Sequence, residues 1–146
     1  MRADMGRHLI LSANEARFLD NPDPPRKACI QYSWAAHAAA PLAWAMGLLD
    51  ELHRPDDQTD ISALVELTYP DCINRVTQTK ALRPLEQILD ARDLAYRYHW
   101  AVRNASVSGA PAPARLDGGV VMERHRGLNW LTRYCDLDWD DVTTDT

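Results

Sequence analysis

The feature that most constrains the fold of this chain is a long, apolar stretch from about Pro25 to Leu52, which predicts a helix. Proline is tolerated in the first turn of a helix, so the segment NPDPP at residues 21–25 ends one element and opens the next. The core-facing candidates of the long helix are Ile30, Trp34, Leu42, Met46 and Leu49, with Trp44 on a neighbouring stripe. Such wide apolar coverage predicts a helix in the middle of the domain, kinked or split at Pro41.

Helical patterns recur in the rest of the chain. Ser12 and Glu15 have the spacing of a capping box and predict a short helix that ends before residue 21. Asp60 is predicted to cap a short helix that carries Ile61, Leu64, Val65 and Leu67. Pro84 is predicted to open a helix to about residue 104, whose 3.6-residue period is followed by Leu85, Ile88, Leu89, Ala95, Tyr98 and Val102. On its surface, Asp93 and Arg97 have the spacing of an ion pair. A last helix is expected from about Val120 to Tyr134, with Glu123, Arg126 and Arg133 mostly turned away from its apolar side.

These elements predict a mainly α fold. The 146 residues suffice for one core, so we expect a single domain over 1–146, a bundle of about five helices. The Pro/Ala/Gly-rich residues 109–119 are interpreted as a mobile connector, and residues 135–146 as an extended C-terminal strap.

Composition excludes several classes of protein. The net charge of -5 and dispersed arginines argue against nucleic-acid binding, and no apolar run is long enough for a bilayer or a secretory signal. Three cysteines without CxxC spacing fit buried thiols in a reducing compartment better than a disulfide framework. We therefore expect a cytoplasmic protein.

The C-terminal sequence CDLDWDDVTTDT raises a choice between a strap and a cation site. In an extended segment, Leu137 and Trp139 would share one face and anchor the tail with Val142, while the aspartates keep it solvated. Asp136, Asp138 and Asp140 have the 1-3-5 spacing of a calcium loop, but Asp141 stands where the loop needs glycine. The strap is the favoured interpretation. A carboxylate site for magnesium or manganese, completed from elsewhere, is the alternative.

A polar cluster is predicted where the 85–104 and 120–134 helices meet. His99 and Arg103 lie one turn apart on the first helix, and Glu123, Arg124 and Asn129 lie on the second, with Trp100 and Trp130 beside them. These residues have the makeup of a pocket with aromatic walls. The alternative is that Glu123 pairs with an arginine and the histidines bond backbone or water, so that the cluster is structural.

Other chemistry has weaker support. A metal site through His37, His99, His125 and Glu123 lacks any characteristic spacing. Ser33 and His37 lie one turn apart without a visible oxyanion loop, and no cysteine has a histidine within a helical turn. Gly118 and Gly119 before a helix form at most a weak anion-binding start. We therefore assign no metal and no cofactor.

Four segments carry a family resemblance: YSWAAHAAAPLAWAMGLLDEL, YRYHWAVRNASVSGAP, GVVMERHRGLNWL and WDDVTTDT. From about Ser12 onward the chain resembles a bacterial family known as domain of unknown function 4272, with a shortened N-terminus. The resemblance implies a mainly helical soluble protein of bacteria and brings no established activity. The polar positions of its motifs are His99, Arg103, Glu123, Arg124, Asn129, Asp140, Asp141, Thr144 and Asp145. His37 stands where many relatives carry an acid, which removes that acid from any pocket here.

The favoured function is a non-enzymatic module that binds a protein partner or a second copy of itself, because interfaces favour the Trp, Tyr and Arg that this chain supplies. The alternative is a small-molecule-binding protein or hydrolytic enzyme, with Glu123 or His99 as base and Arg103 or Arg124 holding an anionic ligand. In either case Thr144 and Asp145 are expected to close over the side of the bundle that carries Glu123 and Arg124.

Overall fold

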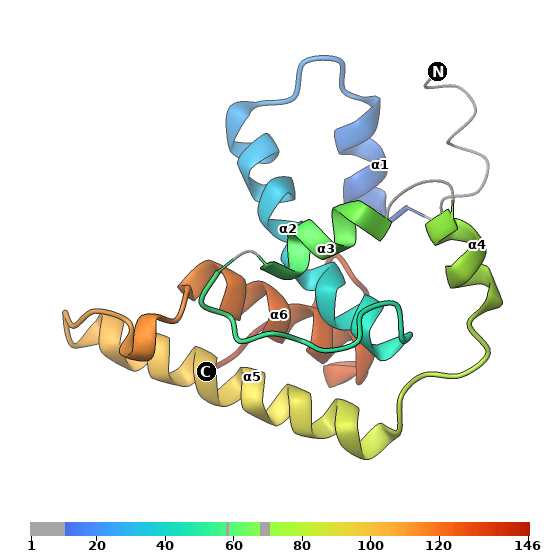
Figure 1. Cartoon of the computed structure of the whole chain (residues 1–146). Helices are drawn as coiled ribbons and strands as arrows, with labels where there is room; N and C mark the ends of the chain where they lie inside the picture. The colour runs from blue at the N-terminus through green and yellow to red at the C-terminus, as the bar shows by residue number, and fades with distance from the viewer. Residues whose placement is uncertain (1–10, 58, 68–70) are drawn as a thin grey trace.

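The computed structural model describes residues 11–57, 59–67 and 71–146, which form six α-helices and two short 3-10 turns (Figure 1). The helices are α1 (Ala13–Asp20), α2 (Arg26–Ala45), α3 (Thr59–Leu67), α4 (Asp71–Gln78), α5 (Leu85–Val107) and α6 (Gly118–Leu131). The turns are η2 (Pro113–Arg115) and η3 (Tyr134–Asp136). None of the described segments is a strand, so the predicted mainly α class is confirmed.

Helix α2 buries a face made largely of small side chains, namely Ala38, Ala40, Ala43 and Ala45 together with His37 and Pro41. Small residues let α6 approach closely. A Cβ on Gly127 would collide with the backbone of Ala38 and touch Pro41, and one on Gly119 would lie 2.6 Å from the Trp34 ring. The predicted central position of α2 therefore rests on an alanine and glycine contact, and Ile30 is exposed rather than core-facing.

The end of α2 differs from the prediction. Gly47 takes a left-handed conformation with φ of 74°, its N–H bonds the carbonyl of Trp44, and the N–H of Leu48 bonds that of Ala43. This is a Schellman motif, which ends the helix at Ala45 and not near Leu52. The predicted split at Pro41 is also wrong, since Pro41 lies within one helix, where it is fully buried against α6.

Helix α6 packs against α2 on one side and α5 on the other. Helix α5 begins after Pro84, as predicted, and buries Ile88, Ala95 and His99. Leu85 and Leu89, whose period predicts a place in the core, are exposed, as is Val65 of α3. They follow a helical period, but on faces that the other described helices leave uncovered.

The N-terminal helix α1 contacts the C-terminal tail, residues 135–146. Ser12 and Glu15 form the predicted capping box of α1, and the Trp139 indole N–H donates to Glu15 Oε1 at 3.1 Å. Asp140 Oδ2 accepts from the Asn14 N–H at 3.0 Å, and Val142 is buried. The tail therefore packs as a strap. Its predicted alternation is wrong, because the N–H groups of residues 141 and 142 both bond the carbonyl of residue 138 and form a turn.

Two cysteines also differ from expectation. Cys29 and Cys135 are free thiols but exposed rather than buried, and the side chain of Cys72 lies outside the described part of the structure.

Candidate functional site

The centre of α6 carries three consecutive buried polar residues, Glu123, Arg124 and His125. Successive helical residues are about 100° apart, so these side chains leave the helix in three directions. Helix α6 can bury all of them because it is covered on several sides. The expectation that Glu123 turns away from the core is therefore wrong.

Arg124 points toward α3 and the segment before it. Its Nη2 donates to Asp60 Oδ2 at 2.5 Å, its Nη1 donates to the carbonyl of His53, and its Nε is a buried donor without an acceptor in the described structure. Burial lowers the pKa of Arg124, and the carboxylate of Asp60 opposes that change. The pair is almost fully buried, so it is a structural ion pair that connects α6 to α3.

Asp60 also forms a hydrogen bond with His53. Its Oδ1 lies 2.7 Å from Nδ1 of His53, whose Nε2 lies 2.7 Å from Oε1 of the exposed Glu51. The hydrogen bond to Asp60 is the main reason that the pKa of His53 is raised. Asp60 is the second residue of α3, and its buried carboxylate makes these tertiary contacts, which corrects its predicted role as a helix cap.

His125 points toward α5, where its Nδ1 shares a 3.0 Å hydrogen bond with Nδ1 of His99. Both rings are buried, and they meet edge to face. Burial first, and then the nearby His99 and Arg92, together lower the pKa of His125 to about 4. Burial, then Arg103, lowers the pKa of His99. The two histidines are therefore a neutral core contact.

Glu123 and Asn129 help to position the C-terminal tail. Glu123 Oε2 accepts from Arg126 Nη1 at 3.1 Å, and the Arg126 guanidinium lies over the Trp139 ring. Asn129 Oδ1 accepts from Arg92 Nε at 2.8 Å, while its Nδ2 donates to the carbonyl of Thr143 at 2.9 Å. These contacts support the structural interpretation of the motif.

The remaining predicted residues lie elsewhere. Trp100 and Arg103 are exposed on α5, and the partly exposed Trp130 meets Trp139 edge to face at 5.3 Å. Thr144 is half-buried, and the exposed Asp145 accepts from the Thr143 hydroxyl at 3.0 Å.

The end of the tail lies on a different side of α6 from the expected one. The charge of Asp145 acts on His125, and the carbonyl of Thr143 bonds Asn129. The tail therefore ends on the side of His125 and Asn129, not on that of Glu123 and Arg124. Side chains from the predicted pocket are thus divided among separate contacts.

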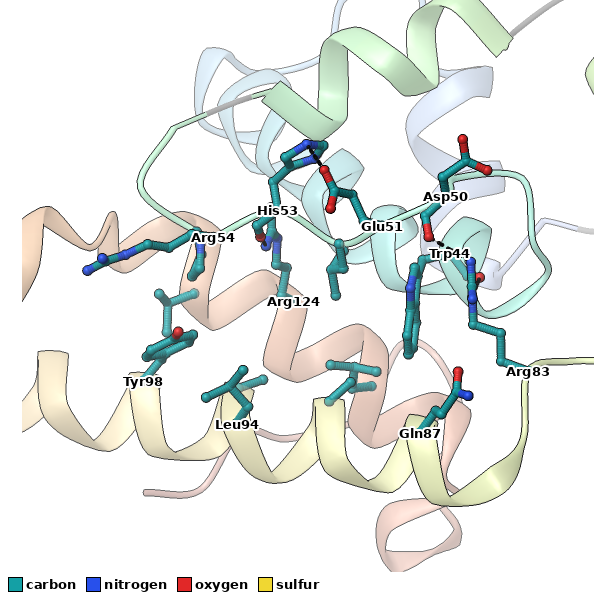
Figure 2. Close-up of a pocket in the computed structure, with 16 residues that line it drawn as sticks. Trp44, Asp50, Glu51, His53, Arg54, Arg83, Gln87, Leu94, Tyr98 and Arg124 are labelled. Carbon is teal, nitrogen blue, oxygen red and sulfur yellow. Dashed lines mark hydrogen bonds and ion pairs between the residues drawn. The ribbon is translucent and has the colours of Figure 1, made fainter.

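A cavity of about 440 Å³ does lie between α5, α6 and residues 50–55 (Figure 2). Its walls include Leu94, Tyr98, Val121 and Leu128, and Trp44 stands at one end beside Arg83. Of the predicted site residues, only Arg124 lines it.

The arginines around this cavity have partners within the chain. Arg83 donates to the carbonyls of Trp44, Leu49 and Asp50, and its guanidinium lies over the Trp44 ring. Arg54 donates to the carbonyl of Ala114 at 2.6 Å. These two guanidinium groups therefore bond the backbone that surrounds the cavity.

The exposed side of α5 carries a row of large apolar side chains, which we call the α5 outer face. Its members are Leu85, Leu89, Tyr96, Trp100 and Val107, with exposed fractions between 43% and 83%. Their spacing of four and seven residues keeps them within a stripe about 60° wide. The periodicity of α5 predicts part of this row in the core, whereas the structure leaves every member of it at least 43% exposed. Tyr96 is partly covered, because its ring meets the His125 ring edge to face at 5.8 Å.

Several alternatives raised by the sequence find no support. Groups of three or more potential metal ligands are absent from the described residues, where Asp136 pairs with Arg133 and Asp140 bonds α1. Ser33 donates to the carbonyl of Ile30 at 2.7 Å. The N–H groups of Gly119 and Val120 donate to the carboxylate of Asp117, so this carboxylate occupies the place of an anion at the N-terminus of α6. No described helix is long and apolar enough to cross a membrane.

Sequence reasoning missed Asp60, His53 and Arg92 as partners of the motif residues. Asp60 and Arg124 are separated by 64 positions, and His53 and Asp60 form no recognisable motif. A buried arginine needs a carboxylate, which is the one signal that could have prompted a search for Asp60.

Comparison with known families agrees with the resemblance in the sequence. Residues 6–142 match the model of a family described as domain of unknown function (DUF4272), and the chain belongs to this family. No curated protein and no solved structure matches the chain.

Proposed function

We propose that this member of the DUF4272 family is a single-domain interaction module of the cytoplasm that binds another protein chain through the α5 outer face. The observation that carries the proposal is the exposure of Trp100 (54%) in a row with Leu85, Leu89, Tyr96 and Val107. Contiguous exposed apolar side chains mark interaction sites, and aromatic residues are enriched there. The two exposed free thiols fit a reducing compartment.

The polar motif supports the same proposal indirectly. His99, Glu123, Arg124 and Asn129 each bond a different neighbour, so they are better suited to fixing α5, α6 and the tail than to acting together on a substrate. Of the predicted site residues, Trp100 belongs to the α5 outer face, and the exposed Arg103 follows it on the same helix. The motif would then serve function by holding α5 rigid beneath its outer face.

In-cell photo-crosslinking tests this function. A photoreactive residue at position 100 should give a discrete crosslinked product, whose second chain is identified by mass spectrometry. The same residue at position 66, exposed on α3 and away from α5, is the control and should give none (Figure 1). Equal products from the two positions, or none from position 100, would contradict the proposal.

A second candidate function, binding of a small molecule, is favoured by the cavity beside Trp44 and Tyr98. Its volume of about 440 Å³ lies in the range of ligand sites. Because Leu94, Tyr98 and Val121 line the cavity, and Arg54 and Arg83 already donate to carbonyls of the chain, we expect a largely apolar ligand rather than an anionic one. His99 and Glu123 do not line this cavity, so it does not support a hydrolytic role for them.

Native mass spectrometry of protein from its own host tests the second candidate. A bound small molecule should be present in the wild type, lost in Ala91→Trp, which fills the cavity, and kept in Ser106→Trp, on an exposed position of the same helix. A spectrum without bound mass in any of the three proteins would count against it.

A further inference from the structure

We infer that the occupant of the α5 outer face is a second copy of this chain, whose α5 packs antiparallel to the first across a two-fold axis. The inference rests on the proposed function, because it names the partner of the same face. Its starting point is the distribution of charge along α5, which accompanies the apolar stripe.

The charged side chains of α5 change sign along its exposed side. The N-terminal half carries Glu86, Asp90 and Asp93, and the C-terminal half carries Arg97 and Arg103, all of them exposed. A parallel pair of helices would place acid beside acid and arginine beside arginine. An antiparallel pair places the acidic half of each helix beside the basic half of the other, so α5 is complementary to itself in that orientation alone.

Asp93 and Arg97 fix the register of this pairing. They already form an ion pair within one helix, with Arg97 Nε 2.7 Å from Asp93 Oδ2, and both side chains are more than half exposed. In an antiparallel pair, Asp93 of each copy can also face Arg97 of the other copy. The two-fold axis then crosses α5 at the level of Ala95, near the middle of the helix.

The apolar residues agree with this register. With the axis at the level of Ala95, Trp100 of one copy lies next to Leu89 of the other, and Tyr96 lies near its own counterpart. The stripe is about 33 Å long at 1.5 Å per residue, which is long enough for two helices to interdigitate over several turns. A closed two-fold dimer would also cover the face in both copies at once, leaving no open edge for further association.

Charge-reversed variants test the inference in purified protein. Asp93→Arg and Arg97→Asp should each sediment as monomers, with dimer dissociation constants raised at least tenfold over the wild type. Mixed in equal amounts, the two variants should form a heterodimer, because positions 93 and 97 then carry two arginines in one chain and two aspartates in the other. Circular dichroism should show both variants folded, since exposed ion pairs contribute little to stability.

Glu66→Arg is the matched control, because it makes the same kind of charge reversal at an exposed position of α3. It should dimerise as the wild type does. Single variants that dimerise normally, or a mixture that stays monomeric while the wild type dimerises, would overturn the antiparallel pairing. A wild type that is monomeric at all concentrations would overturn self-association, whereas a crosslink from position 100 to a different protein would still uphold the proposed function.

Discussion

His99 and His125 touch through their Nδ1 atoms at 3.0 Å in the buried contact between α5 and α6. One ring must donate and the other accept, so the contact holds only while at least one imidazole is neutral. This pair lies directly beneath the outer face of α5, and it links the stability of the helix to pH.

Stability should fall as the pH is lowered from about 6.5 toward 4. The pKa of His125 is lowered to about 4 in the folded chain, mainly by burial, so over this range the unfolded chain binds a proton that the folded chain does not. The free energy of unfolding therefore rises between pH 4 and 6.5, by an amount on the order of 2–3 kcal/mol. Above pH 6.5 this contribution is complete. Urea unfolding at pH 5 and 7 measures it. His125→Gln should flatten the difference, and an unchanged slope in this variant would contradict the assignment.

Breaking the ion pair of Asp60 and Arg124 should be costly on either side. Asp60→Asn leaves a buried arginine without its counter-charge and should lower the free energy of unfolding by about 3–5 kcal/mol. Arg124→Met should also be costly but less so, because the Asp60 carboxylate keeps its contact with His53. The double variant Asp60→Asn/Arg124→Met should lose much less than the sum of the two. Additive losses in denaturant unfolding would show that the residues do not act as a pair.

Gly127→Ala should destabilise the contact of α2 and α6. The new Cβ would overlap the Ala38 backbone, which cannot move without shifting α2, so we expect a loss of about 1–3 kcal/mol or more. Gly118→Ala, whose Cβ would lie 3.1 Å from a side-chain methyl of Val102 and would meet no backbone, is the matched control and should lose less. Thermal unfolding of the two variants gives the comparison, and equal losses would argue against the close crossing.

The indole of Trp139 should tie the tail to α1. Trp139→Phe removes the N–H that donates to Glu15 and keeps an aromatic ring against Trp130, so it should cost about 0.5–1.5 kcal/mol. Hydrogen exchange should rise for the amide of Asn14, which bonds Asp140 beside it. Unaltered exchange at that amide would mean that the tail is held by other contacts.

The sequence predicted those parts of the fold that local chemistry determines. The capping box at Ser12 and the start of α5 after Pro84 depend on neighbouring residues, and both are confirmed. The apolar pattern alone places the end of α2 too late, because it ignores the left-handed turn at Gly47, although glycine at that place is a recognisable signal.

The site was less predictable, because its contacts join distant residues. Arg124 and Asn129 suggested a shared pocket, yet Arg124 pairs with Asp60, which is 64 positions away, and Asn129 bonds Arg92, which is 37 positions away. Periodicity also could not distinguish a buried stripe from an exposed one on α5. Leu85 and Leu89 fit a helical period as well as Ile88 does, and only the position of α6 decides which of them is covered.

Sedimentation equilibrium of the purified wild type beside Trp100→Lys tests the central claim most directly. If the α5 outer face joins two copies, the wild type should sediment with twice the mass of the chain and the variant with the mass of one, both with the same helical circular dichroism. Equal monomeric masses for the two proteins across the accessible concentrations would contradict it, as would a dimer that survives the charge placed at position 100.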